Sequence, residues 1–400
     1  MLSYKYLIVG GGMCADAAVR GIRQVDPLGA IGLVGAEAYP PYDRPPLSNG
    51  LWNPPGLPRE RIWRKTEALE ADLRLGRSVV KLDLRYKEAV DSQGQRYEFE
   101  KLLLATGGTP RRLDLTGDSA GIIYYRTLDD YDRLRRLAEQ GRRFAVIGGG
   151  FIGSELAVAL AGHKKEVVMI FPEAAIGARL LPGPLAQRLN DGFRQHGVEL
   201  WTGDTPAEVR AAGQRWAVRT RQGRETLVDG VVAGVGLLPN ADLAAAAGLT
   251  ARNGIDVDDL LRTSHPDVYA AGDVASFYSP VLSKRLRVEH EDNANMMGMQ
   301  AGRNMAGEEE PYTHLPYFYS ELFDVSYEAV GDLDALHGQL ETVEDWTQPY
   351  EKGVVYFVRQ GRVRGVLLWN VPDQVMAARR LMTQPEPILP KDLPGRLPAK

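Results

Sequence analysis

Tyr6-Leu-Ile-Val-Gly10-Gly-Gly12-Met-Cys-Ala15, close to the start of the chain, decides the fold. An apolar run leads into glycines spaced G-x-G-x-x-A, and an amphipathic helical pattern follows over residues 15–25. Glycines at these positions let the chain turn tightly and let a pyrophosphate reach the main chain. The free N–H groups and the positive dipole end of the helix then face the anion. The stretch therefore predicts a strand–turn–helix unit that binds a dinucleotide.

The same design recurs in the middle of the chain. Phe144-Ala-Val-Ile-Gly148-Gly-Gly150-Phe-Ile-Gly153 is a full G-x-G-x-x-G run, again with an apolar strand before it and a helical pattern after it. One such motif alone is a weak signal, whereas two predict two dinucleotides in one chain. The simplest interpretation is a flavin and a nicotinamide that exchange electrons.

The composition excludes several classes of protein. The chain has 400 residues, 44% of them hydrophobic, which is enough for two or three domains with cores of their own. A net charge of −4 does not indicate a nucleic-acid or anionic-membrane partner. The sequence holds no apolar stretch that could span a bilayer and no signal-peptide pattern, so we expect a cytoplasmic protein. We expect no metal site.

Cys14 is the only cysteine. An intrachain disulfide and a redox-active cysteine pair are therefore impossible, which separates this chain from the disulfide reductases that share the two fingerprints. Because Cys14 lies inside the first glycine loop, we interpret it as a small buried filler rather than a redox group.

Three side chains extend the first dinucleotide unit. Glu37 follows the second predicted strand, 30–35, where an acidic side chain can bind ribose hydroxyls, although a solvated loop glutamate is the alternative. Arg44 stands in a proline-rich loop and can pair with a phosphate, or simply be solvated. Asp273 ends a buried strand, where it can accept from a ribityl hydroxyl while the start of the next helix faces the phosphates; an ordinary turn is the alternative.

The rest of the chain indicates duplication followed by a third domain. The run that ends at Thr106 and Gly107 repeats in the run that ends at Gly236, and a helix is predicted over 128–140. Antiparallel strands are predicted at 354–358 and 363–370, with a closing helix near 372–382. The expected fold is α/β, with two Rossmann-like dinucleotide-binding domains and a C-terminal α+β domain. The domain ranges are 1–120 and 246–310 for FAD, 121–245 for NAD(H), and 311–400 for the C-terminal interface domain.

Together these residues resemble the two-dinucleotide flavoprotein reductases, and among them apoptosis-inducing factor and its prokaryotic relatives. The resemblance covers nearly the whole chain. Its most specific stretches are Pro41-Tyr-Asp-Arg-Pro-Pro-Leu-Ser48, Leu104-Ala-Thr-Gly-Gly-Thr-Pro110, Gly148–Glu155, Arg287-Val-Glu-His-Glu-Asp292 and Gly353–Asn370.

The resemblance implies a set of FAD contacts and a set of NADH contacts. The FAD set is Gly10, Gly12 and Ala15 at the pyrophosphate, Glu37 at the ribose, Arg44, Asn49, Val80, Thr106, Gly107, Arg126, Asp273, Glu289 and His290 at the isoalloxazine, and Tyr319, where the family has tryptophan. The NADH set is Gly148, Gly150, Phe151, Gly153, Glu155 beside the nicotinamide, Glu173 and Arg179 at the adenosine ribose, and Gly236. The catalytic group is Glu155, His290 and Phe151.

Physical arguments support some of these roles. A helix predicted to start at His290 would direct its dipole at an anionic reduced flavin, although a satisfied core histidine is the alternative. Glu155 is an unusual charge in an apolar helix, and simple helix stabilisation is the alternative to a nicotinamide partner. Core packing explains Phe151 almost as well as stacking does.

Two positions affect the expected nucleotide chemistry. Glu173 suits a ribose diol and repels a 2′-phosphate, so we expect NADH rather than NADPH, although the nearby Arg179 weakens the argument. Asn49 stands where the family has a lysine that pairs with a glutamate near the flavin, so Glu155 would lack its ammonium partner. We therefore expect altered nicotinamide affinity or hydride rate.

Three functions remain open. The first is an NADH-dependent FAD oxidoreductase that passes electrons to quinone, oxygen, a small dye-like acceptor or a one-electron protein. The second is a ferredoxin or rubredoxin reductase, for which the basic segment 284–287 would attract an acidic partner, unless that segment is a solvated loop or a subunit contact. The third is a redox-sensing module that dimerises with NADH.

Overall fold

The computed structural model describes residues 1–53, 56–334 and 340–397. The chain divides into two compact units, each assembled from separate segments. Unit 1 comprises Met1–Arg44, Pro58–Thr109 and Leu238–Pro316, and unit 2 comprises Pro45–Leu57, Pro110–Leu237 and Tyr317–Lys400.

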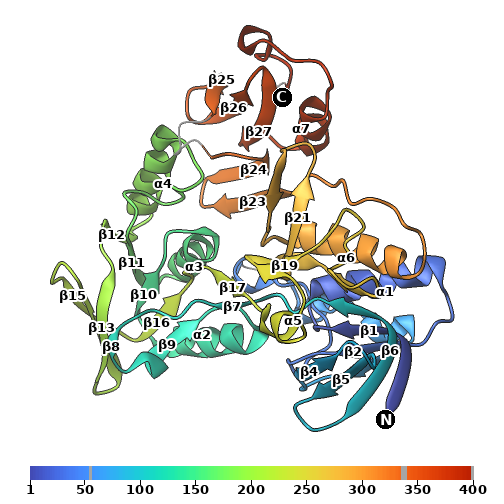
Figure 1. Ribbon diagram of the computed structural model, residues 1–400. Coiled ribbons are helices and arrows are strands. Elements are labelled where there is room, and N and C mark those ends of the chain that lie inside the picture. The colour runs from blue at the N-terminus through green and yellow to red at the C-terminus, as the bar shows by residue number, and fades with distance from the viewer. Residues whose placement is uncertain (54–55, 335–339, 398–400) are drawn as a thin grey trace. The chain divides into compact units, whose positions relative to one another are not determined.

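The main sheet of unit 1 carries the first fingerprint (Figure 1). Its strands lie in the order β3 (Ala71–Arg74), β2 (Ile31–Val34), β1 (Leu2–Val9), β6 (Arg96–Leu104), β5 (Glu88–Asp91) and β4 (Val79–Asp83), and β20 (Val268–Ala270) also pairs with β6. The parallel strands of this sheet are β1, β2, β3, β6 and β20. β4 and β5 add an antiparallel edge next to β6. β2 and residues 6–9 of β1 are buried on both faces, as the apolar run before Gly10 predicts.

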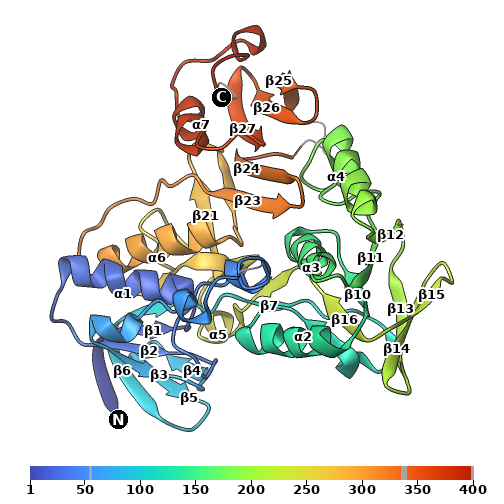
Figure 2. The ribbon, with the colours of Figure 1, turned by 180° about the vertical axis from the view of Figure 1, so that it is seen from behind.

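Two helices of unit 1 lie side by side in both ribbon views (Figures 1 and 2). They are α1 (Met13–Val25), which follows the first fingerprint, and α6 (Glu291–Met305). Their main chains come so close that a Cβ at Gly298 would lie 2.3 Å from the Cys14 carbonyl oxygen. This packing fixes the first turn of α1 against α6.

No helix follows Asp273 directly in the chain. A single 3-10 turn, η5 (Gly272–Val274), leads directly into strand β21 (Ala275–Ser279). β21 belongs to a small sheet ordered β18 (Ala251–Arg252), β19 (Gly254–Asp256), β21 and β22 (Lys284–Leu286). Pairing with β19 and β22 satisfies the backbone of this segment, and the next helix along the chain is α6, which packs on η5.

Unit 2 repeats the parallel design around the second fingerprint. Its parallel sheet is ordered β12 (Glu199–Thr202), β11 (Glu166–Phe171), β10 (Arg143–Ile147), β16 (Gly230–Ala233) and β9 (Ile122–Tyr124). Helix α2 (Leu128–Gln140) packs on β9 and β16, and helix α3 (Phe151–Gly162) packs on β10 and β11. A capping box between Thr127 and Asp130 starts α2 at the predicted residue.

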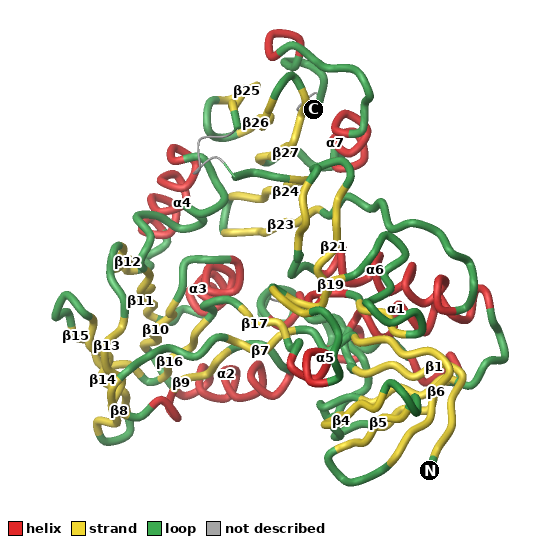
Figure 3. Tube along the Cα trace, viewed as in Figure 1, coloured by secondary structure: helices red, strands yellow, loops and turns green. Residues whose placement is uncertain are grey.

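The C-terminal part of unit 2 is an antiparallel sheet with one covering helix (Figure 3). Its strands lie in the order β23 (Tyr317–Leu322), β24 (Val325–Gly331), β27 (Arg362–Trp369), β26 (Lys352–Arg359) and β25 (Glu341–Gln348). Helix α7 (Val375–Met382) packs on β24 and β27. The predicted strands at 354–358 and 363–370 and the predicted helix near 372–382 are confirmed, as is the predicted fold class.

The remaining elements are short or lie at the edges of the units. They are α4 (Gly183–Gln195), α5 (Asp242–Ala246), β7 (Gly108–Pro110), β8 (Thr116–Gly117), β13 (Pro206–Ala212), β14 (Arg215–Thr220), β15 (Glu225–Val228), β17 (Leu237–Pro239), η1 (Pro45–Leu47), η2 (Arg59–Ile62), η3 (Thr66–Leu69), η4 (Ser119–Gly121) and η6 (Pro390–Asp392).

Candidate functional site

The two fingerprints have the same backbone geometry. Gly10 has a φ of +133° and Gly148 a φ of +114°, a region that L-residues rarely adopt. A Cβ at Gly10 would lie 2.1 Å from the Ala105 carbonyl oxygen, and one at Gly148 would lie 2.3 Å from that of Gly234. In both units the glycine therefore lets the turn approach the end of the neighbouring parallel strand, β6 in unit 1 and β16 in unit 2.

The middle glycine of each fingerprint opens onto free space. A Cβ at Gly150 would meet no heavy atom within 4 Å, and one at Gly12 would meet only the Arg44 Nη2, at 3.9 Å. Gly12 and Gly150 are the N-caps of α1 and α3. Glycine has no side chain, so neither N-cap residue bonds to the first N–H groups of its helix through a side chain. Both cradles therefore fit a pyrophosphate group bound by main-chain N–H groups.

A charged cluster stands at the end of β2 in unit 1. Glu37 accepts a hydrogen bond from the Tyr42 hydroxyl at 2.5 Å and forms an ion pair with Arg44. The Arg44 guanidinium also lies 5.1 Å from the centre of the Tyr42 ring. Burial lowers the pKa of Arg44, but the phenol of Tyr42 and the carboxylate of Glu37 outweigh it and raise that pKa above its ordinary value. Glu37 is thus held in place as a hydrogen-bond acceptor.

Asp273, Cys14 and His290 converge in the same unit. A Cβ at Gly272 would lie 3.1 Å from the Cys14 Sγ, which places the thiol against the turn that carries Asp273. Burial, and then the charge of Asp273, raise the pKa of the Cys14 thiol far above its ordinary value. Cys14 is buried and protonated, which agrees with its interpretation as a filler.

His290 caps helix α6. Its Nδ1 accepts a hydrogen bond from the Asp292 main-chain N–H at 3.3 Å. Burial lowers the pKa of His290 to about 4, although Asp292 and Asp273 act in the opposite direction. The ring is therefore neutral at pH 7, and because Nδ1 is an acceptor, Nε2 carries the proton and remains a donor.

The two arginines of the basic segment 284–287 make contacts inside unit 1. Arg287 has a side chain that is 10% exposed, forms an ion pair with Glu289 at 2.7 Å and donates to the Asp273 carbonyl oxygen. Arg285 donates to the carbonyl oxygens of Val257 and Ser276. Arg287 therefore braces the turn that carries Asp273, and Arg285 braces the small sheet, while Lys284 and Arg285 remain exposed.

Glu155 is the central polar group on α3 in unit 2. Its Oε2 accepts a hydrogen bond from the Ser48 hydroxyl at 2.5 Å, and its Oε1 accepts one from the Ser320 hydroxyl at 3.0 Å. Burial, and then the charge of Glu155, raise the pKa of Tyr327 well above its ordinary value. The carboxylate is thus oriented by neutral hydroxyl groups at both oxygens.

Phe151 begins α3 next to the same face of the C-terminal sheet. Its ring packs edge-on against Phe318 at 5.5 Å and lies tilted against Tyr327 at 6.4 Å. The side chain is nevertheless 38% exposed. Phe151 therefore combines aromatic packing with a free surface, so both interpretations of this residue remain open.

Asn49 and Glu173 are engaged locally. The Asn49 side chain accepts from the main-chain N–H of Gly50 within its own loop. Glu173, at the end of the second parallel strand of unit 2, forms an ion pair with Arg179 at 2.5 Å. The Arg179 side chain is 80% exposed, so this pair can rearrange at little cost.

The other predicted residues occupy strand ends and loops. The Thr106 hydroxyl donates to the Asn240 carbonyl oxygen, and the main chain of Gly107 accepts from Asn240. Ala15 is buried in α1, and Val80 is exposed on β4. Arg126 precedes the capping box of α2, and Gly153 lies in α3. Gly236 has a φ of +90°, and Tyr319 in β23 stacks on Tyr317.

Sequence reasoning missed the residues that orient the candidate acids. Tyr42 holds Glu37, while Ser48 and Ser320 hold Glu155. Tyr42 and Ser48 lie in the stretch 41–48 that carries the resemblance, so a polar residue there was a usable signal. No local sequence pattern indicates the role of Ser320. It lies next to Glu155 because of the way the C-terminal sheet is folded, which depends on distant segments of the chain.

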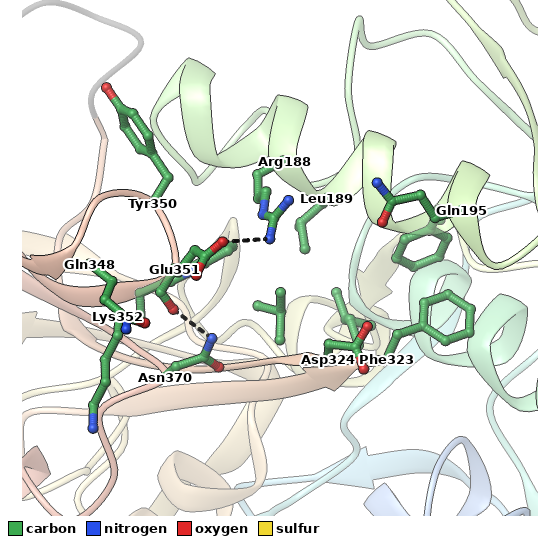
Figure 4. Close-up of a pocket in the computed structure, with 15 residues that line it drawn as sticks. Arg188, Leu189, Gln195, Phe323, Asp324, Gln348, Tyr350, Glu351, Lys352 and Asn370 are labelled. Carbon is green, nitrogen blue, oxygen red and sulfur yellow. Dashed lines mark hydrogen bonds and ion pairs between the residues drawn. The ribbon is translucent and has the colours of Figure 1, made fainter.

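A separate pocket in unit 2 does not contain the predicted site residues. It has a volume of about 360 Å³ and lies between α4 and the strands β23, β24, β26 and β27 (Figure 4). On one side Arg188 approaches the Glu351 carboxylate at 3.4 Å, and Asn370 donates to the Glu351 carbonyl oxygen at 2.8 Å. None of the fifteen lining residues, all of them described, is a predicted site residue.

Fold and site together define a class of protein. Two Rossmann-type glycine cradles, an acidic side chain at the end of each second strand and an antiparallel C-terminal sheet are features of an oxidoreductase that uses two dinucleotides. Among the described helices, none is both long and apolar enough to cross a membrane.

Comparison with known proteins gives the family. The family model of the pyridine nucleotide-disulphide oxidoreductases matches residues 4–298. A model of the mitochondrion-associated C-terminal part of apoptosis-inducing factor matches residues 301–349 and 338–384. The chain belongs to the pyridine nucleotide-disulphide oxidoreductase family.

Individual relatives cover nearly the whole chain. Monodehydroascorbate reductase 3 of Arabidopsis thaliana is 34% identical over 92% of this chain and 89% of its own length. The ferredoxin–NAD(+) reductase component of the anthranilate 1,2-dioxygenase system of Burkholderia cepacia is 33% identical over 96% of this chain and 95% of its own. A solved covalent complex of putidaredoxin reductase with putidaredoxin superposes with a TM-score of 0.90, at 27% identity, over 98% of this chain and 95% of that one.

These findings confirm the expected activity class. The chain is an FAD-dependent NAD(P)H oxidoreductase related to apoptosis-inducing factor, and its cofactors are FAD and a nicotinamide dinucleotide. Because its single cysteine is buried, its electrons pass to an acceptor without a cysteine pair.

Proposed function

We propose that this protein oxidises NADH and delivers the electrons to a one-electron carrier of the ferredoxin type. The observation that carries the nicotinamide half is the start of α3, where Gly150 opens onto free space and Glu155 is held by two hydroxyl groups. The acceptor half follows from the relatives, since a ferredoxin and monodehydroascorbate both accept single electrons.

The residues proposed to hold the pyrophosphate and ribose of FAD lie at the first fingerprint. Gly10, Gly12 and Ala15 would receive the pyrophosphate at the start of α1, and Glu37, fixed by Tyr42, would accept from the ribose hydroxyls. The other proposed FAD contacts are Arg44, Asn49, Val80, Thr106, Gly107, Arg126, Asp273, Glu289, His290 and Tyr319. When bound, FAD accepts a hydride as an electron pair and releases the electrons one at a time.

His290 has a specific proposed task. Because its Nδ1 accepts from the α6 main chain, the ring presents Nε2–H as a neutral donor. The positive end of α6 acts in the same direction. Both groups would stabilise negative charge that develops on a neighbouring ring, without a proton being lost from an imidazolium.

The residues proposed to hold NADH surround the second fingerprint. Gly148, Gly150 and Gly153 would receive the pyrophosphate, and Gly236 would line the site. Phe151, with its exposed face, would pack on the nicotinamide, and the Glu155 carboxylate would accept from its carboxamide N–H.

The proposed preference for NADH rests on Glu173. Its carboxylate would accept from the adenosine ribose diol and repel a 2′-phosphate. Arg179 is paired with this carboxylate, so a 2′-phosphate would have to compete with Glu173 for the Arg179 guanidinium.

An acceptor panel tests the proposal. Protein loaded with FAD is titrated with NADH without oxygen, and the reduced protein is mixed with a ferredoxin-type protein, monodehydroascorbate, a quinone or oxygen. Bleaching by NADH and rapid reoxidation by the ferredoxin-type protein are expected. Fast reoxidation by quinone or oxygen alone would refute the proposed acceptor, and the absence of bleaching would refute the NADH site.

A redox-sensing role is the second candidate, because the C-terminal part matches the corresponding part of apoptosis-inducing factor. In that case turnover would be slow, and NADH would shift the protein from monomer to homodimer in sedimentation. The four domain ranges and the cytoplasmic location expected from the sequence stay predictions.

A further inference from the structure

Asp16 is a fully buried carboxylate in the first turn of α1, directly after the first fingerprint. Its Oδ2 pairs with the Arg64 Nε at 2.9 Å, and its Oδ1 accepts a hydrogen bond from the Thr66 hydroxyl at 2.7 Å. Arg20, one turn further along α1, binds the same carboxylate and also donates to the Arg64 carbonyl oxygen at 2.6 Å. These contacts fasten the start of α1 to segment 62–66.

Segment 62–66 lies along the loop that carries Tyr42. Tyr42 and Trp63 form an isolated antiparallel β-bridge, and their rings pack edge-on with centres 6.0 Å apart. The Arg64 main-chain N–H donates to the Pro41 carbonyl oxygen at 3.0 Å. Segment 62–66 therefore holds the loop at Tyr42 in place through both main chain and side chain.

The Arg64 guanidinium lies at the centre of these contacts. Besides binding Asp16, its Nη1 lies 3.4 Å from the Asp43 carboxylate and donates to the Asn295 side chain of α6 at 2.7 Å. The Arg64 side chain is 16% exposed. Because a largely buried cation depends on its partners, loss of the Asp16 carboxylate would disturb α1, α6 and the loop together.

We infer that Asp16 is a positioning residue for FAD, which sets the distance between the pyrophosphate cradle on α1 and the Glu37 carboxylate at the adenosine ribose. The contacts run from Asp16 through segment 62–66 to Tyr42, whose hydroxyl donates to Glu37 at 2.5 Å. This inference rests on the proposed roles of the first fingerprint and Glu37 in holding FAD. A dinucleotide bound at two points gains affinity when those points already have the right separation, because less freedom is lost on binding.

Charge and position have opposite effects at this residue. Asp16 places a negative charge in the first turn of a helix whose start would receive an anionic pyrophosphate. If only that charge mattered, the substitution Asp16→Asn would tighten FAD binding. If Asp16 acts by position, the same substitution weakens FAD binding, so the sign of the change separates the two effects.

The test measures the dissociation constant of FAD. FAD is removed from the whole chain, and the apoprotein is titrated with FAD while the flavin fluorescence is followed. Asp16→Asn should raise the dissociation constant about tenfold, and Thr66→Val, which removes one hydrogen bond but no charge, about fivefold. Added salt should leave both changes in place, since ions screen charges and do not restore a lost contact.

Asp26→Asn is the matched control. Asp26 stands at the other end of α1 and accepts from the Lys5 ammonium at 2.7 Å and from the Tyr6 hydroxyl at 2.9 Å. It therefore binds a cation and a hydroxyl as Asp16 does, but these partners lie on β1 instead of in segment 62–66. Asp26→Asn should leave FAD affinity unchanged, and a loss as large as that in Asp16→Asn would overturn the inference.

A double substitution separates position from general stability. In the presence of Glu37→Gln, Asp16→Asn should cost less FAD affinity than in the wild type, because the acceptor that Asp16 positions is already weakened. An undiminished loss in the double variant would overturn the positioning role. Thermal unfolding identifies any variant that fails to fold, and Thr66→Val keeps the test decisive if Asp16→Asn does.

The outcomes separate this inference from the proposed function. If Glu37→Gln leaves the FAD dissociation constant unchanged, the proposed ribose acceptor fails and the inference falls with it. If Glu37→Gln weakens FAD binding but Asp16→Asn and Thr66→Val bind FAD at least as tightly as the wild type, the positioning role is overturned and the proposed function stands.

Discussion

Glu173→Ala should convert the nucleotide preference of this enzyme. In the wild type, Glu173 is 21% exposed and paired at 2.5 Å with Arg179, which is 80% exposed. The exposed pair itself contributes only about 0–1 kcal/mol to stability, so its loss should leave the fold intact. Two changes then act on NADPH, because the carboxylate no longer repels a 2′-phosphate and Arg179 is free to bind it.

The magnitude can be worked out from these contacts. A carboxylate about 5 Å from a doubly charged phosphate costs about 1.7 kcal/mol in a water-like dielectric. A new hydrogen bond between Arg179 and the phosphate adds about 1.5 kcal/mol. Together these gains correspond to a rise of roughly 200-fold in NADPH affinity. NADH loses one charge-assisted hydrogen bond to its ribose, so its affinity should fall about tenfold.

Anaerobic stopped-flow reduction with NADH and with NADPH measures both dissociation constants and both limiting rates. The limiting rates should stay within about twofold of the wild type, since the substitution lies at the adenosine end. Glu173→Ala combined with Arg179→Ala is the control that keeps the loss of repulsion but removes the cation, and it should recover only part of the NADPH gain. An unchanged ratio of NADPH to NADH affinity in Glu173→Ala would refute the placement of the ribose at this residue.

Three further predictions concern other residues. The pKa of His290 is lowered to about 4 in the fold, so this residue stabilises the apoprotein above pH 6.5, and that contribution is lost as pH falls from 6.5 towards 4. His290→Asn keeps a capping acceptor and should flatten the decline in urea unfolding energy between pH 7 and 4.5 by about 1–2 kcal/mol; an unaltered decline counts against a buried neutral imidazole. Gly148→Ala should destabilise the apoprotein by about 3 kcal/mol, because its Cβ would meet the Gly234 carbonyl oxygen, whereas Gly150→Ala should unfold like the wild type but lose NADH affinity; equal melting temperatures for the two variants would contradict the cradle geometry. Cys14 should resist thiol-alkylating reagents in the native protein and react once urea unfolds it, because burial raises its pKa; mass-spectrometric labelling of the folded protein would disprove this.

The parts of the fold that sequence alone predicted are those with local physical causes. Gly10 and Gly148 must be glycine because of their positive φ and the carbonyl oxygen beside them, and these needs leave a readable spacing. The capping box at Thr127 is a local cause of the same kind, and α2 starts at the predicted residue. Such signals lie within a few residues of the structure that they specify.

The parts that sequence did not predict depend on contacts between distant segments. Ser320 meets Glu155 only because β23 lies against α3, and the segment after Asp273 is a strand only because β19 and β22 pair with it. Asp16 likewise gave no signal, although it is fully buried and paired with Arg20 and Arg64. Tertiary pairing decides such positions, and local patterns do not report it.

The segmented make-up of unit 1 constrains how the protein can be made in the cell. The chain leaves unit 1 after Arg44, Thr109 and Pro316 and re-enters it at Pro58 and Leu238. A ribosome must therefore finish β20 and α6 before the sheet begun at residue 2 acquires its last strand and its second helix. During most of translation the apolar faces of the early strands are therefore not covered. A chain truncated before residue 305 should yield an insoluble product rather than a smaller active reductase.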